Sequence, residues 1–504
     1  MRSHSLMSGI KNNPVNRFGS HMGHKIISMK LEENIDHVKK SLLHSSDLIV
    51  RNLEFANRKI GIVFIDTLIK GDVLETQIIQ QIIQNPKETI EETVSIKEIK
   101  TSSSFDESVV ALVKGNAVIF TDNETHAIIL NIALLESRSI EQPDTEQVLR
   151  GAQDGFIESL ETNINLLRRR INNPNLVVKY VTLGRESDTS LAIVYVDSIA
   201  NDELVKEVER RISYIDVDYV SNIEEFIEDN SFSPFPQMLT TSRPDRVSAN
   251  LMDGRVAIIT DGNPSVLVMP ITFFSFYQTT DDYNSRWMMV SFFRIMRMLS
   301  FIISISLPAL YIALVSYHFE IIPIELVSNV KSSLEYIPFP PLIEALSMQI
   351  TLELLRESAI RLPSPISQTL GVVGGLVIGT AVVEANLISN TMLVVISITA
   401  ISSFATPDSE MGTSVRLLGF PLMFAAATIG LIGIVFGLMI ILIHLCKLES
   451  FGTPYFAPFA PFRRKDIKDT IYRVPMWKMT ERPRSALPKK LRSAKNPRGW
   501  KQNE

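Results

Sequence analysis

The sequence predicts a soluble α/β N-terminal region of two related subdomains, followed by an all-α polytopic membrane domain. We expect that domain to contain about four spans and one amphipathic or partly inserted helix. Two observations lead to this fold class: charged residues are frequent up to about Asp282, and very long uncharged runs follow between Met298 and Cys446. A third is a weak repeat inside the soluble region. The chain of 504 residues is also too long for one compact domain.

The expected domain boundaries follow these changes in composition. Residues 1–30 contain no apolar run long enough for a secretory signal, and we expect a disordered extension there. The soluble region should therefore stay on the side of the membrane where it is made. The other expected segments are two α/β subdomains at 31–140 and 141–282, the membrane domain at 283–448 and a basic cytoplasmic tail at 449–504.

Short strands alternate with helices in the soluble region, which is typical of α/β folds. The expected strands are residues 60–66, 117–121, 126–132, 177–183 and 191–197. The expected helices are residues 32–43, 74–84, 145–171 and 202–212.

The repeat joins two stretches of the soluble region. Residues 112–132 align without gaps with residues 251–271, with Leu, Gly, Ile, Thr, Asp and a final Ile identical. Both stretches are expected to form strand, turn and strand, and Gly262 suits the turn of the second hairpin because it tolerates positive φ. IVFIDTL at 62–68 also matches IVYVDSI at 193–199. We therefore expect two related subdomains, although convergent strand composition could produce the same likeness.

Four apolar runs are long enough to cross a bilayer, which takes about 20 residues of helix. They are residues 298–319, 362–383, 385–407 and 417–446. The last of them gives the strongest signal for a span.

Lys and Arg near the ends of these runs indicate their orientation, because both concentrate on the cytoplasmic side. Arg286, Arg294 and Arg297 precede the first run, and the last 42 residues contain 14 Lys and Arg against 4 Asp and Glu. Both flanks are therefore expected to be cytoplasmic, with an even number of spans. Asp408 and Glu410 are then expected on the outer side.

Residues 342–361 are predicted to form a helix that hydropathy alone would discard. PFPP at 338–341 ends any earlier helix and starts this one. Polar side chains recur every four residues and should form one stripe, made up of Gln349, Glu353, Glu357 and Arg361, with Arg356 beside it. Two interpretations stay open: the helix lies flat on the outer interface, or it is inserted among the spans. In the second case the stripe faces water in a pore, because charges at membrane depth face a cavity or each other.

Small residues at G-x-x-x-G spacing occur in two of the runs and let helix backbones approach closely. They are Gly371, Gly375 and Gly379 in the second run and Gly433 and Gly437 in the fourth. Their partners could be helices of the same chain or of another subunit. Cys446 is the single cysteine, so no intrachain disulfide is possible, and we expect a buried, unreactive thiol.

No catalytic or cofactor motif stands out. The sequence has no G-x-G-x-x-G, no Walker loop, no H-E-x-x-H and no paired C-x-x-C, so we expect no enzymatic activity, cofactor or metal. Asp66 and Asp197 end expected strands, where an Asp more often caps a turn than acts in catalysis. Arg168, Arg169 and Arg170 are expected on a solvated helix face or against acidic lipid or a partner. The net charge of −5 suggests no nucleic-acid binding.

Several long stretches carry a family resemblance. They are EQPDTEQVLRGAQDGFIESLETNINLLRRRI at 141–171, SRPDRVSANLMDGRVAIITDGNPSVLVMPITFFSFYQTTDDY at 242–283, IPFPPLIEALSMQITLELLRESAIRLP at 337–363 and SFGTPYFAPFAP at 450–461. These stretches resemble the A subunit of bacterial spore germination receptors, the GerA family. The resemblance covers residues 48–482. The chain before residue 30 and after residue 482 matches nothing in that family pattern.

The resemblance implies a receptor subunit in the inner membrane of a dormant spore. It implies a transporter-like B subunit and a lipoprotein C subunit as partners, nutrients such as amino acids, sugars or nucleosides as signals, and a homo-oligomeric ring whose membrane part conducts ions. The B subunit is then the expected nutrient site. The residues themselves add the polar-striped helix and the glycine-faced spans, which suit a symmetric pore in membrane lipid. The alternatives are a non-conducting signalling or scaffold subunit and a secondary transporter.

Overall fold

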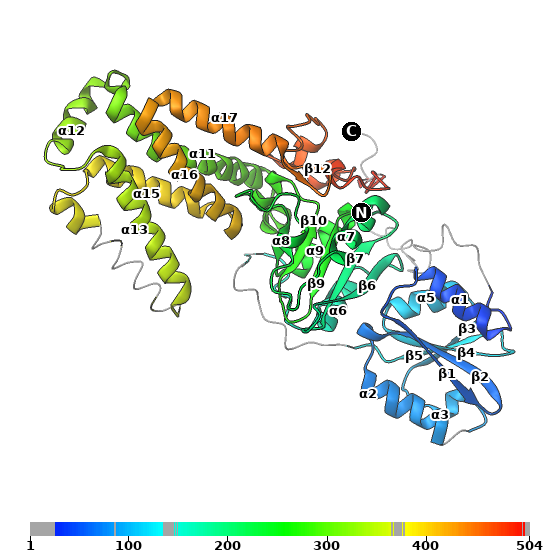
Figure 1. Ribbon diagram of the computed structural model, residues 1–504. Helices are drawn as coiled ribbons and strands as arrows, with labels where there is room; N and C mark the ends of the chain where they lie inside the picture. The colour runs from blue at the N-terminus through cyan, green and yellow to red at the C-terminus, as the bar shows by residue number, and fades with distance from the viewer. Residues whose placement is uncertain are drawn as a thin grey trace, which may run out of the picture.

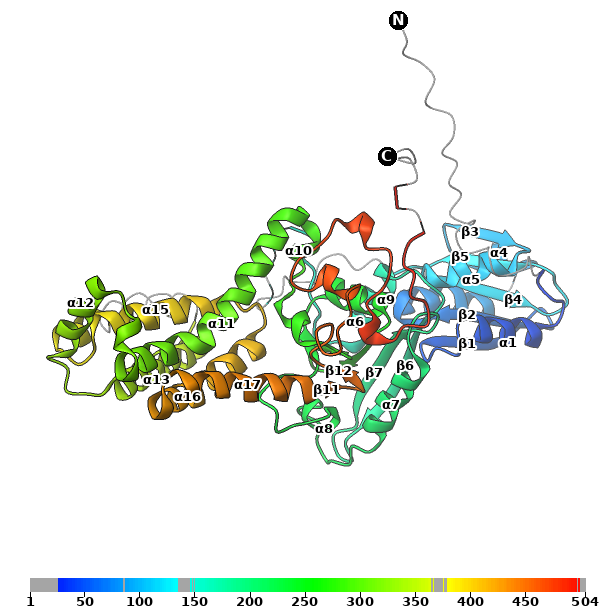
Figure 2. The same cartoon turned by 90° about the horizontal axis from the view of Figure 1, so that it is seen from above.

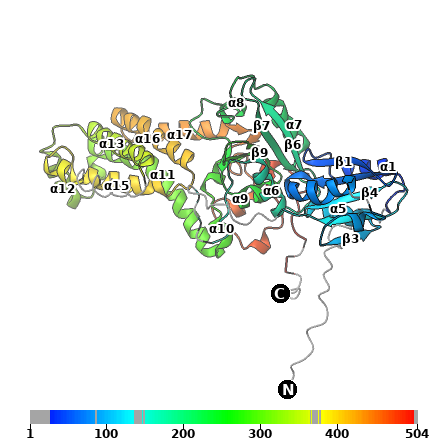
Figure 3. The ribbon, with the colours of Figure 1, turned by 90° about the horizontal axis from the view of Figure 1, so that it is seen from below.

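The computed structural model describes residues 26–84, 87–134, 150–363 and 379–495, with isolated residues in the gaps. Three bodies lie in a row along the chain: a first α/β subdomain, a second α/β subdomain and a helical body (Figure 1). The same elongated arrangement is visible from above and from below (Figures 2 and 3). The second subdomain lies between the other two and contacts both.

The first subdomain is built on a five-stranded antiparallel sheet. Its strands are β1 (Leu48–Phe55), β2 (Arg58–Ile65), β3 (Ile99–Ser102), β4 (Asn116–Thr121) and β5 (Ala127–Asn131). They pair in the order β1-β2-β4-β5-β3. The central strands are apolar at nearly every position because both faces of the sheet are covered by helices.

Helices cover the two faces of this sheet. The helical elements are α1 (Leu31–Ser41), η2 (Asp66–Leu68), α2 (Gly71–Val73), η3 (Leu74–Ile79), α3 (Gln80–Gln84), α4 (Ile90–Thr93) and α5 (Phe105–Val113). One core joins α1 and α5 to one face, and a second joins η3, α3 and α4 to the other. The subdomain is therefore a three-layer α/β/α sandwich.

The second subdomain has the same topology. Its strands are β6 (Leu176–Leu183), β7 (Thr189–Val196), β8 (Leu239–Thr241), β9 (Val256–Thr260) and β10 (Val266–Met269), paired in the order β6-β7-β9-β10-β8. Its helices are α6 (Leu160–Arg170), α7 (Asp202–Ser213), α8 (Glu224–Ile227) and α9 (Pro244–Asp253), followed by η4 (Phe273–Tyr277) and α10 (Asp281–Asn284). The expected pair of related subdomains is confirmed.

One backbone detail recurs in both copies. Gly115 follows α5 with φ +84°, and Gly254 follows α9 with φ +99°, a conformation that residues with a Cβ rarely adopt. A Cβ on Gly115 would lie 2.7 Å from the carbonyl oxygen of Leu68, and one on Gly254 would lie 3.4 Å from that of Ile199. These contacts join the same two repeat positions in each half, so local geometry as well as strand order is shared.

The sequence located the predicted strands within one or two residues, but the start of one helix is wrong. The helix expected at 145–171 begins only at Leu160, where the Ser159 side chain accepts a hydrogen bond from the Thr162 backbone N–H. Gly151, at φ +129°, lies in the irregular segment before it. The serine cap and this glycine explain the shorter helix.

Arg168 is buried rather than solvated, which corrects the expectation for the arginine run. Its guanidinium forms an ion pair with Asp47 of the first subdomain, with 2.5 and 2.7 Å between donor nitrogens and carboxylate oxygens. Both side chains are at most 2% exposed. The arginine was misplaced because its partner lies 121 residues earlier in the chain. This ion pair joins the two subdomains.

The helical body contains most of the expected apolar runs. Its described helices are α11 (Trp287–Tyr317), η5 (Phe319–Ile321), α12 (Ile324–Leu334), α13 (Pro341–Arg361), α15 (Asn390–Phe404), α16 (Ser409–Ile429) and α17 (Leu431–Lys447). Of these, α11 and α16 are long and apolar enough to cross a membrane, while α15 and α17 are apolar but shorter. Most of the second expected run, at 362–383, lies outside the described residues.

The run at 417–446 is two helices rather than one span. Gly430 separates α16 from α17 with φ +65° and ψ −141°. A Cβ on Gly437 would lie 2.5 Å from the Leu422 side chain, so the two helices fold back on each other. A straight helix of 30 residues would be about 45 Å long, well beyond the apolar thickness of a bilayer. The run is long enough for a hairpin, and the glycine makes the turn.

The hairpin reverses the expected position of the acidic residues before it. Met411 and Val415 near the start of α16, and Leu445 near the end of α17, belong to the core of the second subdomain. Asp408 and Glu410 therefore lie at the end of the helical body that contacts the soluble region. The expectation that they lie at the opposite end is wrong, because it assigned one span to a hairpin.

The tail packs against the second subdomain. It contains β11 (Glu449–Ser450), β12 (Thr453–Pro454), η6 (Asp466–Asp469), η7 (Met476–Lys478) and η8 (Arg484–Ala486). Tyr455 is fully buried in the same core as α6 and α9. Cys446, in the last turn of α17, is exposed, so the expected burial of this thiol is wrong: its neighbour Leu445 faces the core instead.

Candidate pore-lining site

The helix expected at 342–361 is present as α13. It begins with Pro341 at its first position, where the missing N–H costs nothing, and it ends where Leu362 turns to an extended conformation before Pro363. Its first half is packed into the helical body through Ala345, Met348 and other apolar side chains. Local sequence therefore sets both ends of this helix.

Two polar contacts show how α13 lies against α15. Near its start, Glu344 accepts a hydrogen bond from the backbone N–H of Ser389, the N-cap of α15. Near its end, Arg356 donates to the hydroxyl of Ser403, in the last turn of α15. The two helices are thus parallel and side by side over 12 residues, about 18 Å of helix. Both lie within the helical body (Figure 1).

A cluster of three charges lies at the second of these contacts. Glu353 accepts from Arg416 of α16, with 3.1 Å from Nε to Oε2, and Arg356 lies 3.4 Å from the same oxygen. The Arg356 guanidinium also lies over the Phe404 ring, 4.7 Å from its centroid. Two arginines around one carboxylate leave this cluster with a net positive charge.

The remaining stripe residues face elsewhere. Glu357 and Arg361 pair with each other one helical turn apart, and both side chains are more than half exposed. Gln349, in contrast, is only 7% exposed. Residues four apart are offset by about 40° on a helix with 3.6 residues per turn. The stripe therefore turns by about 120° from Gln349 to Arg361, which places its two ends on different faces.

The sequence analysis missed three polar residues of this region. Glu344 is completely buried, and its second carboxylate oxygen has no hydrogen-bond partner among the described residues. Its neighbours Ser389 and Arg416 were also missed, although Arg416 directly precedes an apolar run. A charge next to such a run was the available signal, whereas Ser389 gave none.

The glycines divide into two groups. Gly433 and Gly437 face α16, and a Cβ on Gly433 would overlap the Ala425 carbonyl, so this pair packs helices of one chain. A Cβ on Gly375 or on Gly379 would meet no atom within 4 Å among the described residues. Gly371 lies outside the described residues.

A buried charge network connects the soluble region to α11. Arg294 is 1% exposed and lies 2.8 Å from carboxylate oxygens of Asp282 and of Asp469 in the tail. Arg297 pairs with Asp282 at 2.5 Å. Arg473 of the tail donates to the Asp282 backbone carbonyl. The start of α11 is therefore held by the linker before it and by the tail, and any shift of α11 has to move both.

Comparisons with known proteins agree with this architecture. The family model described as Bacillus/Clostridium GerA spore germination protein matches residues 36–485. The chain is 40% identical to the uncharacterized membrane protein YfkQ of Bacillus subtilis (strain 168), over 91% of each chain. It is 38% identical to spore germination protein KA of the same strain, over 94% of this chain and 90% of that protein.

Two further similarities complete the comparison. Spore germination protein A1 of Bacillus subtilis (strain 168) is 38% identical over 90% of this chain and 93% of its own. The crystal structure of the N-terminal domain of the A subunit of the Bacillus megaterium spore germinant receptor GerK3 aligns over 99% of its length with 50% of this chain, at 26% identity and a TM-score of 0.38. The family match over most of the chain and the full-length relatives lead to one conclusion: the chain belongs to the GerA family of spore germination proteins.

Proposed function

We propose that this chain is the A subunit of a nutrient-responsive spore germination receptor. In this proposal it oligomerises into a ring in the spore inner membrane, and the ring conducts monovalent cations when nutrient is present. It is a channel subunit and not an enzyme. Its partners are a transporter-like B subunit and a lipoprotein C subunit, and α13 lines the conducting path.

The observation that carries this proposal is the position of α13. Ionisable side chains lie along a helix that runs beside apolar α15 from end to end. Charged groups at membrane depth face water, each other or a neighbouring subunit. Glu357 and Arg361 are exposed in the single chain, so a neighbouring copy or a water-filled lumen is needed next to them.

The course of the chain supports the proposed orientation. The soluble subdomains, the start of α16 and the end of α17 all lie at one end of the helical body. The tail that follows is rich in Lys and Arg, which favours the cytoplasmic side. We therefore propose that the N-terminal region and the tail both face the spore core.

Ion flux through the reconstituted receptor tests the channel. We expect Glu357→Gln and Glu353→Gln to change potassium efflux or cation selectivity without loss of assembly, because each removes a negative charge from the proposed lumen. Glu325→Gln on exposed α12 is the matched control and should leave flux unchanged. Unchanged flux in both test variants would remove α13 from the pore.

Cysteine accessibility along residues 349–361 gives an independent test. Because Cys446 is exposed, the scan requires a Cys446→Ser background. We expect a water-soluble thiol reagent to label one helical face of α13 in the assembled ring. Labelling of every position, or of none, contradicts a pore-lining face.

One observation favours a second candidate function, a non-conducting scaffold subunit. Glu353 is already neutralised by Arg356 and Arg416 of the same chain, as expected of a residue that only holds helices together. Purified rings that assemble in lipid and never conduct would support this alternative. A secondary transporter has no comparable observation in its favour.

A further inference from the structure

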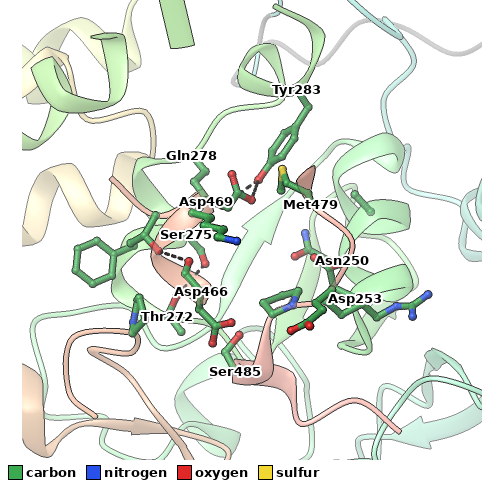
Figure 4. Close-up of a pocket in the computed structure, with 18 of the residues that line it drawn as sticks. Asn250, Asp253, Thr272, Ser275, Gln278, Tyr283, Asp466, Asp469, Met479 and Ser485 are labelled. Atoms are coloured by element: carbon green, nitrogen blue, oxygen red, sulfur yellow. Dashed lines mark hydrogen bonds between the residues drawn. The ribbon is translucent and has the colours of Figure 1, made fainter. Parts of the chain in front are cut away.

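A cavity of about 420 Å³ lies between the second subdomain and the tail. Its walls come from α9, η4 and the linker to α11 on one side and from η6, η7 and η8 of the tail on the other. Figure 4 shows Asn250 and Asp253 on one side of this space and Thr272 and Asp466 on the other. Its volume lies within the range of small-molecule sites, about 300–1,000 Å³.

Two opposite charges in the cavity wall lack ionic partners. Asp253 and Arg255 flank Gly254, where α9 turns into β9. Among the described residues, Asp253 forms no ion pair or hydrogen bond through its carboxylate. Arg255 is 7% exposed, bonds only Asn250 through Nη1, and has no partner for Nε. A buried guanidinium donor without an acceptor is costly, so it indicates a missing anionic or polar partner.

The other charges around the cavity are occupied. Lys465 pairs with Glu481 at 3.0 Å, and Arg246 pairs with Glu146. Arg482 donates to three backbone carbonyls, those of Met252, Lys490 and Arg492. Asp253 and Arg255 are therefore the pair still available for a ligand. Burial raises the pKa of the Asp253 carboxyl to about 6, which the nearby Arg255 partly opposes, and a bound cation would restore its charge.

The first subdomain shows that the shared fold does not require these two charges. In the aligned repeat, Lys114 stands where the second copy has Asp253, and Asn116 stands where it has Arg255. The glycine between them, Gly115 or Gly254, is the same in both. The charge pair is thus specific to the copy that the tail covers.

We propose that this cavity binds a small zwitterion with one ammonium and one carboxylate group, the chemistry of a free amino acid. Arg255 takes the carboxylate and Asp253 takes the ammonium. Apolar lining residues, Leu239, Phe274 and Met479 among them, leave room for an uncharged side chain. A phosphate ligand fits less well, because Asp253, Asp466 and Asp469 all line the same space. The inference deepens the proposed nutrient response and rests on it for its role in germination.

The cavity is physically connected to the membrane helices. Asp469 and Tyr283 line it and share a hydrogen bond of 2.8 Å, and Asp469 also pairs with Arg294 of α11. A ligand between α9 and the tail would stabilise the tail in the position where Asp469 holds α11. Occupancy of the cavity would thus favour one arrangement of α11 over others.

Calorimetric titration of the full chain in lipid nanodiscs tests the site directly. The probes are the 20 common amino acids, with D-glucose and inorganic phosphate as other chemical classes. We expect at least one uncharged amino acid to bind, and its N-acetyl and methyl ester derivatives to bind about 10- to 100-fold more weakly, as expected for loss of one charged hydrogen bond. Asp253→Asn should weaken the free amino acid by a similar factor and leave its binding insensitive to N-acetylation.

Controls separate loss of the site from loss of the fold. Asp218→Asn, on an exposed loop of the same subdomain, should bind as the unmodified chain does. Arg255→Lys keeps the charge and should retain part of the affinity that Arg255→Gln loses. Absence of binding by every amino acid, equal binding of the blocked derivatives, or stronger binding of glucose or phosphate would overturn the proposal. Ion flux is measured separately, so a conducting receptor without this binding would refute the site and leave the channel intact.

Discussion

The two α/β subdomains have one topology but different surroundings. In the first copy, the core under α1 and α5 consists of that subdomain's own residues. In the second copy, the equivalent core under α6 and α9 extends to Ile305 of α11, to the α16–α17 hairpin and to Tyr455 of the tail. One duplicated fold thus serves as a peripheral module in the first position and as the platform for the helical body in the second. The difference teaches that the residues around a shared fold, not the fold, assign each copy its role.

Arg168→Ala tests whether the two copies act as one unit and should have the largest effect. It leaves the Asp47 carboxylate buried without its cation, which typically costs about 3–5 kcal/mol. Urea unfolding of the soluble region in the full chain measures this. Arg169→Ala, at the exposed neighbouring position, should change the free energy of unfolding by less than about 0.5 kcal/mol. Equal effects of the two variants would show that the subdomains are not coupled through this ion pair.

Alanine at the paired glycines compares the two copies at one equivalent position. Both positions have positive φ, which costs a residue with a Cβ about 1–2 kcal/mol. Gly115→Ala also clashes with the rigid Leu68 carbonyl, so we expect about 2–3 kcal/mol of destabilisation. At Gly254 the nearest atom is the Pro488 side chain of the tail, 2.9 Å away, so we expect a smaller loss. Limited proteolysis should show a released tail only in Gly254→Ala, and release in both variants would contradict the comparison.

The pH dependence of stability should differ between the copies because Asp253 has Lys114 as its counterpart. The pKa of Asp253 is about 6 in the folded chain, above its unfolded value, so the folded state binds the proton more tightly. Its contribution is fully present below about pH 4 and is lost as the pH rises to about 6. Asp253→Asn should remove that loss, roughly 1–2 kcal/mol, in thermal unfolding between pH 4 and 7. An unchanged pH profile would show that the carboxyl is not buried as described.

Much of the fold followed from local sequence. Strands 60–66 and 191–197 were correct because their apolar residues are continuous and end at turn-forming Asp. The helix at Pro341–Arg361 was correct because prolines set its limits. The duplication was visible because core positions and one glycine recur at the same spacing in both halves. All of these signals depend on neighbours within a few residues.

The site was less predictable because its geometry depends on distant contacts. Glu353 was proposed from its spacing, but its partner Arg416 lies 63 residues later. Glu344 is buried against Ser389 at the start of α15, a contact that no local pattern indicates. The hairpin at Gly430 was missed because an apolar run has the same composition whether it crosses once or folds back. The cavity at Asp253 and Arg255 was missed because half of its wall belongs to the tail.

The sequence by itself determined the class of protein, the paired α/β subdomains and the polar-striped helix, since each rests on apolar periodicity and backbone preferences that act locally. Only the tertiary structure decided which charges meet. Arg168 finds Asp47, Arg294 finds Asp469, and Asp253, among the residues that the structure describes, is left without a partner beside Arg255. The physical reason is that the energy of a charge depends on burial and on what lies within a few ångströms, which the folded chain sets and sequence spacing does not.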